Sequence, residues 1–298
     1  MAGFLLLCLL WASDSLQSDL VPGQAGKWMP VFERQALEFA LLAAVAGIFS
    51  VVRKAPVPAA RRIIEWVLTS LSLFVVPSLL VHFSRAWIGE LTRVALFSLV
   101  PVFAVVVDPY VGRGKTMLSG SGMVAALAAV AGTCLVFQVD VPHSISSGAA
   151  WCAVIVAAVC IAVANSRAVL LANDEVSLMS TIAIASGTAC AGFGLASALT
   201  EHPLWSGSGF GLAWTALMSF AALLLFWLMK RMTAVSMTTR FVVAPLFANL
   251  AGLAMLRPTL RGRAVAGLLL IAAGAGWLLL ARDDAQTSVN MPQTLNLD

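Results

Sequence analysis

Long apolar stretches separated by short polar segments run along almost the whole chain. A helix needs about 20 mostly apolar residues to cross a bilayer, because each residue adds about 1.5 Å to its length. The first apolar stretch also resembles the core of a signal peptide, but no Lys or Arg precedes it as such a peptide requires. We therefore expect it to be retained as a span. The pattern predicts ten transmembrane helices, at 3–21, 35–52, 62–82, 87–107, 118–138, 148–170, 177–199, 208–229, 236–256 and 263–281.

Composition agrees with this pattern. The chain of 298 residues is 60% hydrophobic and 11% charged, whereas soluble globular proteins are about 45–50% apolar and about 25% charged. We therefore expect an all-α polytopic membrane protein whose surroundings are the lipid bilayer. The net charge of +4 comes with no aromatic-interleaved basic cluster, so no nucleic acid partner is expected. The five cysteines form no CxxC and have no His at ligand spacing, which predicts no metal site and no cofactor.

The distribution of Lys and Arg predicts the orientation in the membrane, because cytoplasmic loops carry an excess of both. With a cytoplasmic N-terminus, eleven of the 18 basic residues lie in cytoplasmic segments, six lie on the opposite side and Arg93 lies within a span. Both termini are therefore predicted to be cytoplasmic, with residues 283–298 as a disordered cytoplasmic tail. Short loops and the absence of a targeting signal favour a bacterial inner (plasma) membrane. The eleven are Arg53, Lys54, Arg61, Arg62, Arg113, Lys115, Arg167, Lys230, Arg231, Arg240 and Arg282.

The two halves of the chain share a pattern of prolines and glycines. "PVFA" begins at Pro101 and "PLFA" at Pro245, and each proline is followed by a glycine 31 residues later, at Gly132 and Gly276. A proline inside a helix removes a hydrogen bond, which is tolerable at membrane depth where the freed carbonyl faces a cavity or a partner helix. We interpret both prolines as helix kinks at a gate. The alternative is that prolines are common in transmembrane helices and that apolar sequence gives chance matches.

The halves also begin alike, with "ASDS" at 12–15 and "VANS" at 163–166. Five spans per half is an odd number, so the second copy would cross the membrane in the opposite direction. The sequence thus predicts two inverted five-helix repeats, 1–140 and 141–282, an arrangement found in many secondary transporters.

Four segments carry a resemblance to a known family. "LLCLLWASDS", "RVALFSLVPVFAVVV", "MTTRFVVAPLFANLAGLAM" and "VAGLLLIAAGAGWLLL" resemble the first, fourth, ninth and tenth spans of the drug/metabolite transporter superfamily, in its ten-helix EamA-type branch. The resemblance extends over essentially the whole chain and implies a permease for small metabolites or drugs. The sequence departs from the family at Asp14, where an Asn-like residue is usual, and at Glu38, where Arg is frequent. These departures leave the substrate open.

Ionisable residues within the spans are the first candidates for a binding site, because each costs about 2.5–3.5 kcal/mol to insert. Asp14 would bind a substrate amine or carry a proton, or it would lie at a wet helix end. Glu90 and Arg93 stand at i and i+3 and can form an ion pair on the helix face of Pro101. Arg93 would then hold a substrate carboxylate or Glu90 would titrate. Alternatively, the pair would be neutralised and purely structural.

Three uncharged residues complete the candidate binding site. Asn249 shares a helix face with Pro245 and would bind either a ligand or a neighbouring helix. Trp11 and Trp214 would wall the site or pack as ordinary aromatic residues. Outside this set, we expect Glu38 to pair with Arg34 at i+4.

These features favour a secondary transporter with alternating access that moves a small molecule across the membrane, with export the expected direction. Proton coupling, exchange and facilitated diffusion fit the sequence equally. The absence of GxxxxGK[ST] excludes ATP-driven pumping by this chain. The alternatives are an intramembrane lipid-modifying enzyme and a non-transporting scaffold or sensor. No HExxH, GxSxG or carboxylate cluster is present, so we expect no catalytic residues and no enzyme.

Overall fold

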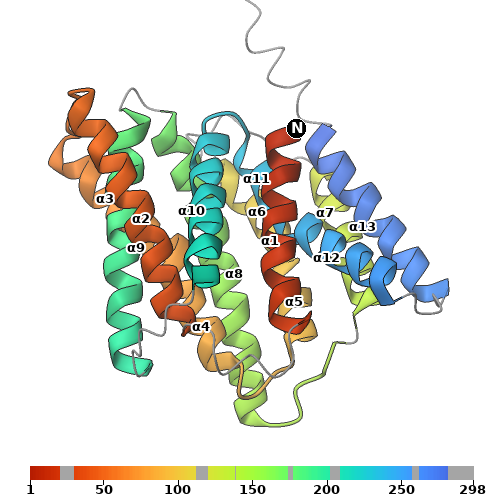
Figure 1. The fold of residues 1–298 in the computed structure, drawn as a ribbon. Helices are drawn as coiled ribbons and strands as arrows, with labels where there is room; N and C mark the ends of the chain where they lie inside the picture. The colour runs from red at the N-terminus through yellow and green to blue at the C-terminus, as the bar shows by residue number, and fades with distance from the viewer. Residues whose placement is uncertain are drawn as a thin grey trace, which may run out of the picture.

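The computed structural model describes residues 1–20, 30–111, 120–137, 139–173, 177–201, 209–256 and 262–280. These residues form helices joined by short connections, without a strand among them (Figure 1). The elements are α1 (Ala2–Leu20), α2 (Val31–Val52), α3 (Ala60–Ser70), the π-helical turn η2 (Leu71–Val75), α4 (Val76–Ser84), α5 (Glu90–Phe97), α6 (Val100–Val111), α7 (Gly120–Val136), α8 (Ile145–Ala172), α9 (Leu178–Thr200), α10 (Gly209–Met229), α11 (Ala234–Thr238), α12 (Arg240–Leu256) and α13 (Gly262–Leu280).

The helices confirm the all-α membrane class. Within the described residues, 8 helical segments are long and apolar enough to cross a membrane, and two shorter apolar helices, Ala2–Asp14 and Gly120–Val136, accompany them. Large apolar side chains cover the outer surface, as contact with lipid requires; Ile64 and Leu269 are 58% and 65% exposed. The predicted tail at 283–298 lies outside the described residues.

Prolines explain where one predicted span divides. Pro101 cannot donate to the carbonyl oxygen of Phe97, so α5 ends at Phe97 and a turn at Ser98 and Leu99 precedes α6. Pro101 is then the second residue of α6, a position whose N–H has no helical partner in any case. The continuous face from Glu90 through Pro101 that the sequence predicted is therefore interrupted.

Two pairs of helices, one from each half of the chain, run antiparallel. α2 begins where α9 ends, since the backbone N–H of Phe32 donates to Oε1 of Glu201 at 3.0 Å, and α2 ends where α9 begins, with the hydroxyls of Ser50 and Ser180 2.8 Å apart. The α7–α13 pair makes similarly close backbone contact through glycines. α8 packs against α4 and α6 in the interior, and α1 begins and α13 ends at the same end of the bundle, uppermost in Figure 1.

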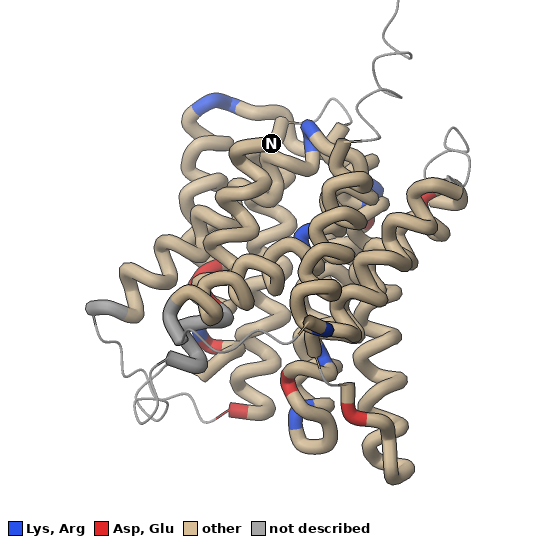
Figure 2. Tube along the Cα trace, turned by 90° about the vertical axis from the view of Figure 1, so that its right-hand side faces the viewer, with Lys and Arg blue, Asp and Glu red and all other residues tan. Residues whose placement is uncertain are grey.

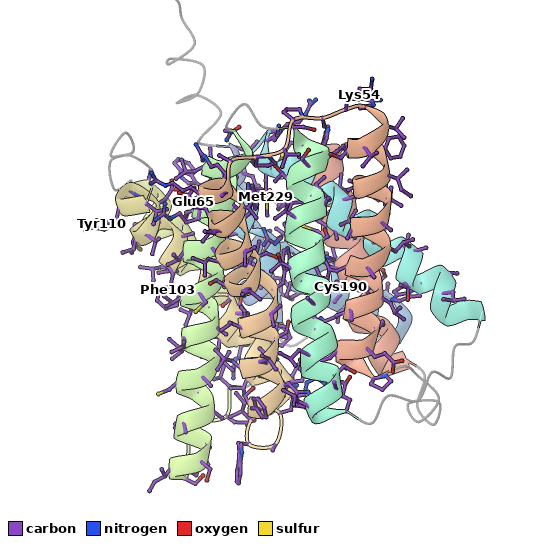
Figure 3. The ribbon with its side chains drawn as sticks, turned by 90° about the vertical axis from the view of Figure 1, so that its left-hand side faces the viewer. Lys54, Glu65, Phe103, Tyr110, Cys190 and Met229 are labelled. Atoms are coloured by element: carbon purple, nitrogen blue, oxygen red, sulfur yellow. The ribbon has the colours of Figure 1, made fainter. Side chains whose placement is uncertain are left out.

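The two ends of the bundle differ in charge, which Figure 2 shows along the trace. We call the end where α1 begins the basic end; Figure 3 places Lys54 in its α2–α3 connection and Glu65 on α3 toward the same side. Arg240, which the sequence analysis assigned to a cytoplasmic segment, is instead buried and 1% exposed. The basic end holds Arg53, Lys54, Arg61, Arg62, Arg167, Lys230 and Arg231, and the opposite end Arg34, Arg85, Arg93 and Arg263.

Glycines set the distance between α7 and α13. A Cβ added at Gly132 would lie 2.6 Å from the carbonyl oxygen of Gly267, and one at Gly274 would lie 2.5 Å from that of Ala125. Both neighbours are backbone atoms, which cannot move aside as a flexible side chain can. Gly276, which the sequence pattern paired with Gly132, meets nothing within 4 Å. The contact therefore depends on Gly132, Gly267 and Gly274.

We expect Gly132→Ala to lower the apparent melting temperature of the purified protein in detergent, with a loss of about 1–3 kcal/mol of stability from overpacking. Gly276→Ala is the matched control and should leave the melting temperature unchanged or slightly raised. Equal melting temperatures for the two variants would contradict the close α7–α13 contact.

Candidate functional site

A cavity of about 450 Å³ lies within the bundle and is lined by both halves of the chain. It reaches the end opposite the basic end, because Val31 at the start of α2 and Arg85 just after α4 are among its lining residues. α7 and α13 contribute no lining residue. The polar and charged members of the lining are Asp14, Arg34, Gln35, Glu38, Ser78, His82, Arg85 and Arg240.

Buried apolar side chains separate this cavity from the basic end. They come from the start of α1, the end of α10 and α11, and each is at most 2% exposed. None of them lines the cavity, so the structure is open toward one end and packed shut toward the other. These residues are Phe4, Leu7, Met229, Val235 and Met237.

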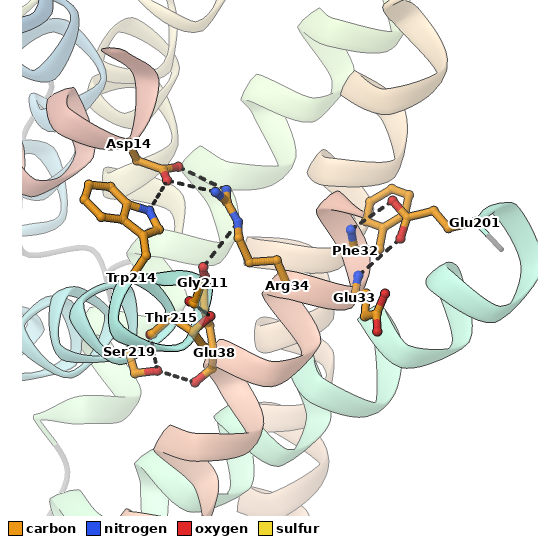
Figure 4. Close-up of polar contacts among 10 residues, drawn as sticks. All are labelled: Asp14, Phe32, Glu33, Arg34, Glu38, Glu201, Gly211, Trp214, Thr215 and Ser219. Carbon is orange, nitrogen blue, oxygen red and sulfur yellow. Dashed lines mark hydrogen bonds and ion pairs between the residues drawn. The ribbon is translucent and has the colours of Figure 1, made fainter. Parts of the chain in front are cut away.

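Asp14 joins three helices inside the cavity (Figure 4). Its Oδ1 lies 3.1 Å from Nη1 of Arg34 on α2 and accepts a hydrogen bond of 2.8 Å from Nε1 of Trp214 on α10. Its Oδ2 accepts from Nη2 of Arg34 at 3.2 Å. The carboxylate thus holds a two-pronged ion pair and a neutral donor at once. Both charged side chains remain about a quarter to a third exposed, at 31% for Asp14 and 27% for Arg34.

Glu38 extends this cluster one turn further along α2. Its Oε1 lies 3.4 Å from Nε of Arg34, within ion-pair range but outside hydrogen-bond geometry. This is the i,i+4 pair that the sequence predicted. The backbone carbonyl of Glu38 accepts from Oγ of Ser219 at 2.9 Å, which fixes α10 against α2 (Figure 4). The Glu38 side chain lines the cavity, and the contact described for its carboxylate is the ion pair with Arg34.

Arg240 at the start of α12 is the deeply buried charge of the cavity. Its Nη1 donates to Oδ1 of Asn165 at 3.1 Å and to the carbonyl oxygen of Met237 at 2.9 Å. The guanidinium carbon lies 5.2 Å from the ring centroid of Trp11 and 4.7 Å from that of Phe241, so aromatic rings cover it. The cation is held in place by neutral oxygens and π-systems.

Several polar atoms of the lining are buried without a hydrogen-bond partner within the described residues. They belong to the cluster around Arg34, to the opposite wall and to Arg240. A buried polar group without a partner costs about 1–3 kcal/mol, so their concentration around one cavity is typical of a binding site rather than of a packed core. The atoms are Nε of Arg34, Oε1 of Gln35, Oε1 of Glu38, Nδ1 of His82 and Nε of Arg240.

A π-helical turn shapes one wall. Pro77 cannot donate to the carbonyl oxygen of Leu73, and just before it the backbone widens so that N–H of Val76 donates to Leu71 five residues earlier. Leu73, Phe74 and Pro77 all line the cavity. This proline had no counterpart in the repeat pattern, and its place in the wall gives it a structural role in the site.

Some of the site residues predicted from the sequence line the cavity and others do not. Trp11, Asp14 and Pro245 line the cavity, and Trp214 stands behind Asp14 as its hydrogen-bond donor. The other candidates are not among the lining residues. They are Glu90, Arg93, Pro101 and Asn249.

Three of these four residues have a local partner. Arg93 lies 3.9 Å from Glu90, as their i,i+3 spacing predicted, and also donates to the carbonyl oxygen of Ile88 at 3.2 Å. Glu90 is 61% exposed. Asn249 donates from Nδ2 to the carbonyl oxygen of Pro245 at 2.8 Å, within its own helix.

Sequence reasoning missed the functional placement of Arg34, Glu38 and Arg240. Arg34 and Glu38 were treated only as a local pair, although two charges one turn inside an apolar run are a signal of a polar cavity. Arg240 stands between "MTT" and "FVV", where a charge next to a helix start is indistinguishable from a loop charge. Asn165, in the "VANS" segment at 163–166, is fully buried and holds Arg240.

The part of the chain that the structure describes contains no set of side chains that could bind a metal ion. No group of three or more His, Cys, Asp or Glu side chains comes close enough there to hold an ion. The polar groups of the cavity are carboxylates, guanidinium groups, an amide, an imidazole and a hydroxyl. They can bind a charged or amphipathic organic molecule through ion pairs and hydrogen bonds.

Comparison with known proteins informs on the fold. No protein-family model and no curated protein matches the sequence. A solved structure described only as "Crystal structure of protein" is similar, with a TM-score of 0.74 and 18% sequence identity over 94% of this chain and 98% of that chain. At this identity the likeness shows a shared fold alone. Fold and site together define an all-helical membrane protein with a polar cavity inside its bundle.

We expect Asp14 and Arg34 to be energetically coupled. Asp14→Asn leaves a partly buried guanidinium without its main partner, whereas the same change in an Arg34→Gln background removes no ion pair. Melting temperatures of the wild type, the two single variants and the double variant in detergent form a thermodynamic cycle. A coupling of about 0.5–3 kcal/mol is typical of residues in direct contact. Additive effects of the two substitutions would show that the pair is solvated and unimportant for stability.

Proposed function

We propose that the protein is a secondary transporter that moves a small metabolite or drug across the membrane by alternating access between two inverted repeats. The observation that carries the proposal is the cavity of about 450 Å³, lined by both halves of the chain, open at one end and packed shut at the other. A channel would need a continuous path. Gln35, His82 and Arg240 each turn a buried polar atom without a hydrogen-bond partner in the described residues to the same cavity, which favours a binding site over a purely structural bundle.

The order of the elements supports ten spans in two inverted repeats. α1, α2, α3–η2–α4, α5–α6 and α7 would correspond to α8, α9, α10, α11–α12 and α13. In both halves the proline-bearing fourth span is broken by a turn, at Ser98 and Leu99 directly before α6 and at Thr239 directly before α12, inside which Pro245 lies. The first copy of a helix and its second copy run antiparallel in the α2–α9 and α7–α13 pairs, which is the relation that an inverted repeat requires.

The charge distribution supports a cytoplasmic basic end. Within the described residues it carries seven basic residues against four at the other end, and Lys and Arg are enriched on the cytoplasmic side. On this assignment the start of α1 and the end of α13 face the cytoplasm. The cavity then opens outward, and transport requires a second state in which it opens toward the basic end.

Family resemblance supports the same function. The EamA-type resemblance of the first, fourth, ninth and tenth spans implies a permease, with export the expected direction and a bacterial inner membrane the expected location. Asp14 and Glu38 are the carboxylates positioned for proton coupling, because both line the cavity. Glu90, exposed and outside the lining, has no such position.

The function is tested first by ligand binding. The melting temperature of the detergent-purified protein is measured against amino acids, purines, sugars, organic cations and nucleotides. A ligand at a hundredfold excess over its dissociation constant stabilises the native state by about 2.7 kcal/mol. Compounds that raise the melting temperature are then tested for counterflow into proteoliposomes that contain the protein.

Filling the cavity should abolish both binding and flux. Ala222→Trp places an indole in the lining, and a melting temperature near that of the wild type would show that the fold accepts it. Ala273→Trp, on the exposed face of α13, is the matched control and should behave as the wild type. Flux that persists in Ala222→Trp would remove the cavity from the transport path. Binding without flux in the wild type would favour a sensor, and chemical conversion of the compound would favour an enzyme.

A further inference from the structure

Arg240 is a buried cation that no described carboxylate neutralises. Its hydrogen bonds go to two neutral oxygens, Oδ1 of Asn165 and the carbonyl of Met237, and among the described residues no Asp or Glu forms an ion pair with it. Arg34 in the same cavity differs, because its charge is met by Asp14 at 3.1 Å and Glu38 at 3.4 Å. A buried charge without a counter-charge is costly, and such residues at membrane depth face partners or substrates.

The contacts of Arg240 leave one edge of its guanidinium for a ligand. Both hydrogen bonds come from Nη1, while Nε is buried and has no partner in the described part of the protein. The rings of Trp11 and Phe241 lie over the guanidinium at 5.2 and 4.7 Å, so a ligand has to approach in the plane. The Nε–Nη2 edge binds a carboxylate through two parallel hydrogen bonds.

The surroundings select the class of anion. One guanidinium compensates one negative charge, so a dianionic phosphate would leave an uncompensated charge in an apolar region, which is unfavourable. The lining rings over Arg240 are those of Trp11 and Phe241, and Phe97 stacks on Phe241 in turn. An apolar ligand body is therefore favoured beside a single carboxylate.

We propose that Arg240 binds the carboxylate of a monoanionic substrate whose apolar body packs against Trp11 and Phe241. This assignment rests on the proposed transport function, because the ligand is the molecule that the cavity carries. On α1, Trp11 lies about one helical turn nearer the basic end than Asp14. Because Arg240 packs over Trp11, it lies deeper from the open end than the Asp14–Arg34 pair. The carboxylate passes this pair and Arg85 on its way in.

Asn165 supplies a sharp test. Its Oδ1 already lies 3.1 Å from Nη1 of Arg240, so Asn165→Asp places a carboxylate at that point with almost no change of shape and neutralises the guanidinium from within. Asn165→Ala removes the contact with Arg240 and also the bond from Nδ2 to the carbonyl of Ala234, which Asn165→Asp loses as well, without adding a charge. Arg231→Gln is a control for loss of an arginine over a tryptophan, since Arg231 lies 4.4 Å from the Trp227 ring at the basic end.

The probes are 3-phenylpropionate and its uncharged amide, 3-phenylpropionamide. Phenyl phosphate is the dianionic compound for comparison. Dissociation constants are measured in detergent from the ligand-dependent melting temperature. We expect the wild type, Asn165→Ala and Arg231→Gln to bind the acid at least about tenfold more tightly than the amide or the phosphate, as for a buried charge pair. Asn165→Asp should lose this preference and keep the affinity for the amide. Arg240→Lys should retain part of the preference for the acid, because lysine keeps the charge but cannot form the two parallel hydrogen bonds.

Equal affinities of the wild type for acid and amide would overturn the proposal, as would undiminished acid binding by Asn165→Asp. Tighter binding of phenyl phosphate than of the acid would overturn the monoanion assignment. Because binding is measured without flux, the two proposals fail separately. Acid binding that Asn165→Asp abolishes, without counterflow of the acid, supports the Arg240 site and contradicts transport. Counterflow of another compound by a protein that does not prefer the acid supports transport and contradicts the Arg240 site.

Discussion

The constraint on which the structure depends is that a polar group at membrane depth must find its partners inside the protein. The backbone meets this constraint by forming helices along the apolar stretches, and at Pro101 and Pro77 by a turn and a π-helical turn where the regular bond cannot form. The side chains meet it by collecting around one cavity. Charges that would be costly against lipid are thereby concentrated where α1, α2, α10 and α12 face one another.

Two arginines of that cavity are met by different kinds of side chain. Asp14 in "ASDS" is a carboxylate and neutralises Arg34, whereas Asn165 in "VANS" is an amide and leaves Arg240 with its charge. An amide can orient a guanidinium by accepting a hydrogen bond, but it cannot compensate the charge. This difference makes one arginine a structural link between helices and the other a candidate for contact with an anion.

Rigid and adjustable contacts are separated in space. α7 and α13 meet through glycines at backbone distance, away from the cavity, and have little freedom to shift without a clash. The helices around the cavity meet through ion pairs, aromatic rings and single hydroxyl bonds, such as Ser219 to Glu38 and Phe39 to Phe193. Contacts of this kind can be exchanged for others at small cost, which suits the helices that have to move if access alternates.

The sequence by itself determined the class of protein, because length and hydropathy alone decide whether a helix can be buried in lipid. It also determined the local pairs at helical spacing, Arg34 with Glu38 and Glu90 with Arg93, since i,i+3 and i,i+4 geometry is a property of any helix. Asp14 and Trp11, predicted as binding residues, and Pro245, predicted as a kink, line the cavity, while Asn249 bonds its own helix. Only the tertiary structure decided that Arg240 is buried and that Asn165 holds it, 75 positions away in the chain. Burial depends on which helices pack together, and local sequence does not encode that for a charge next to a helix start.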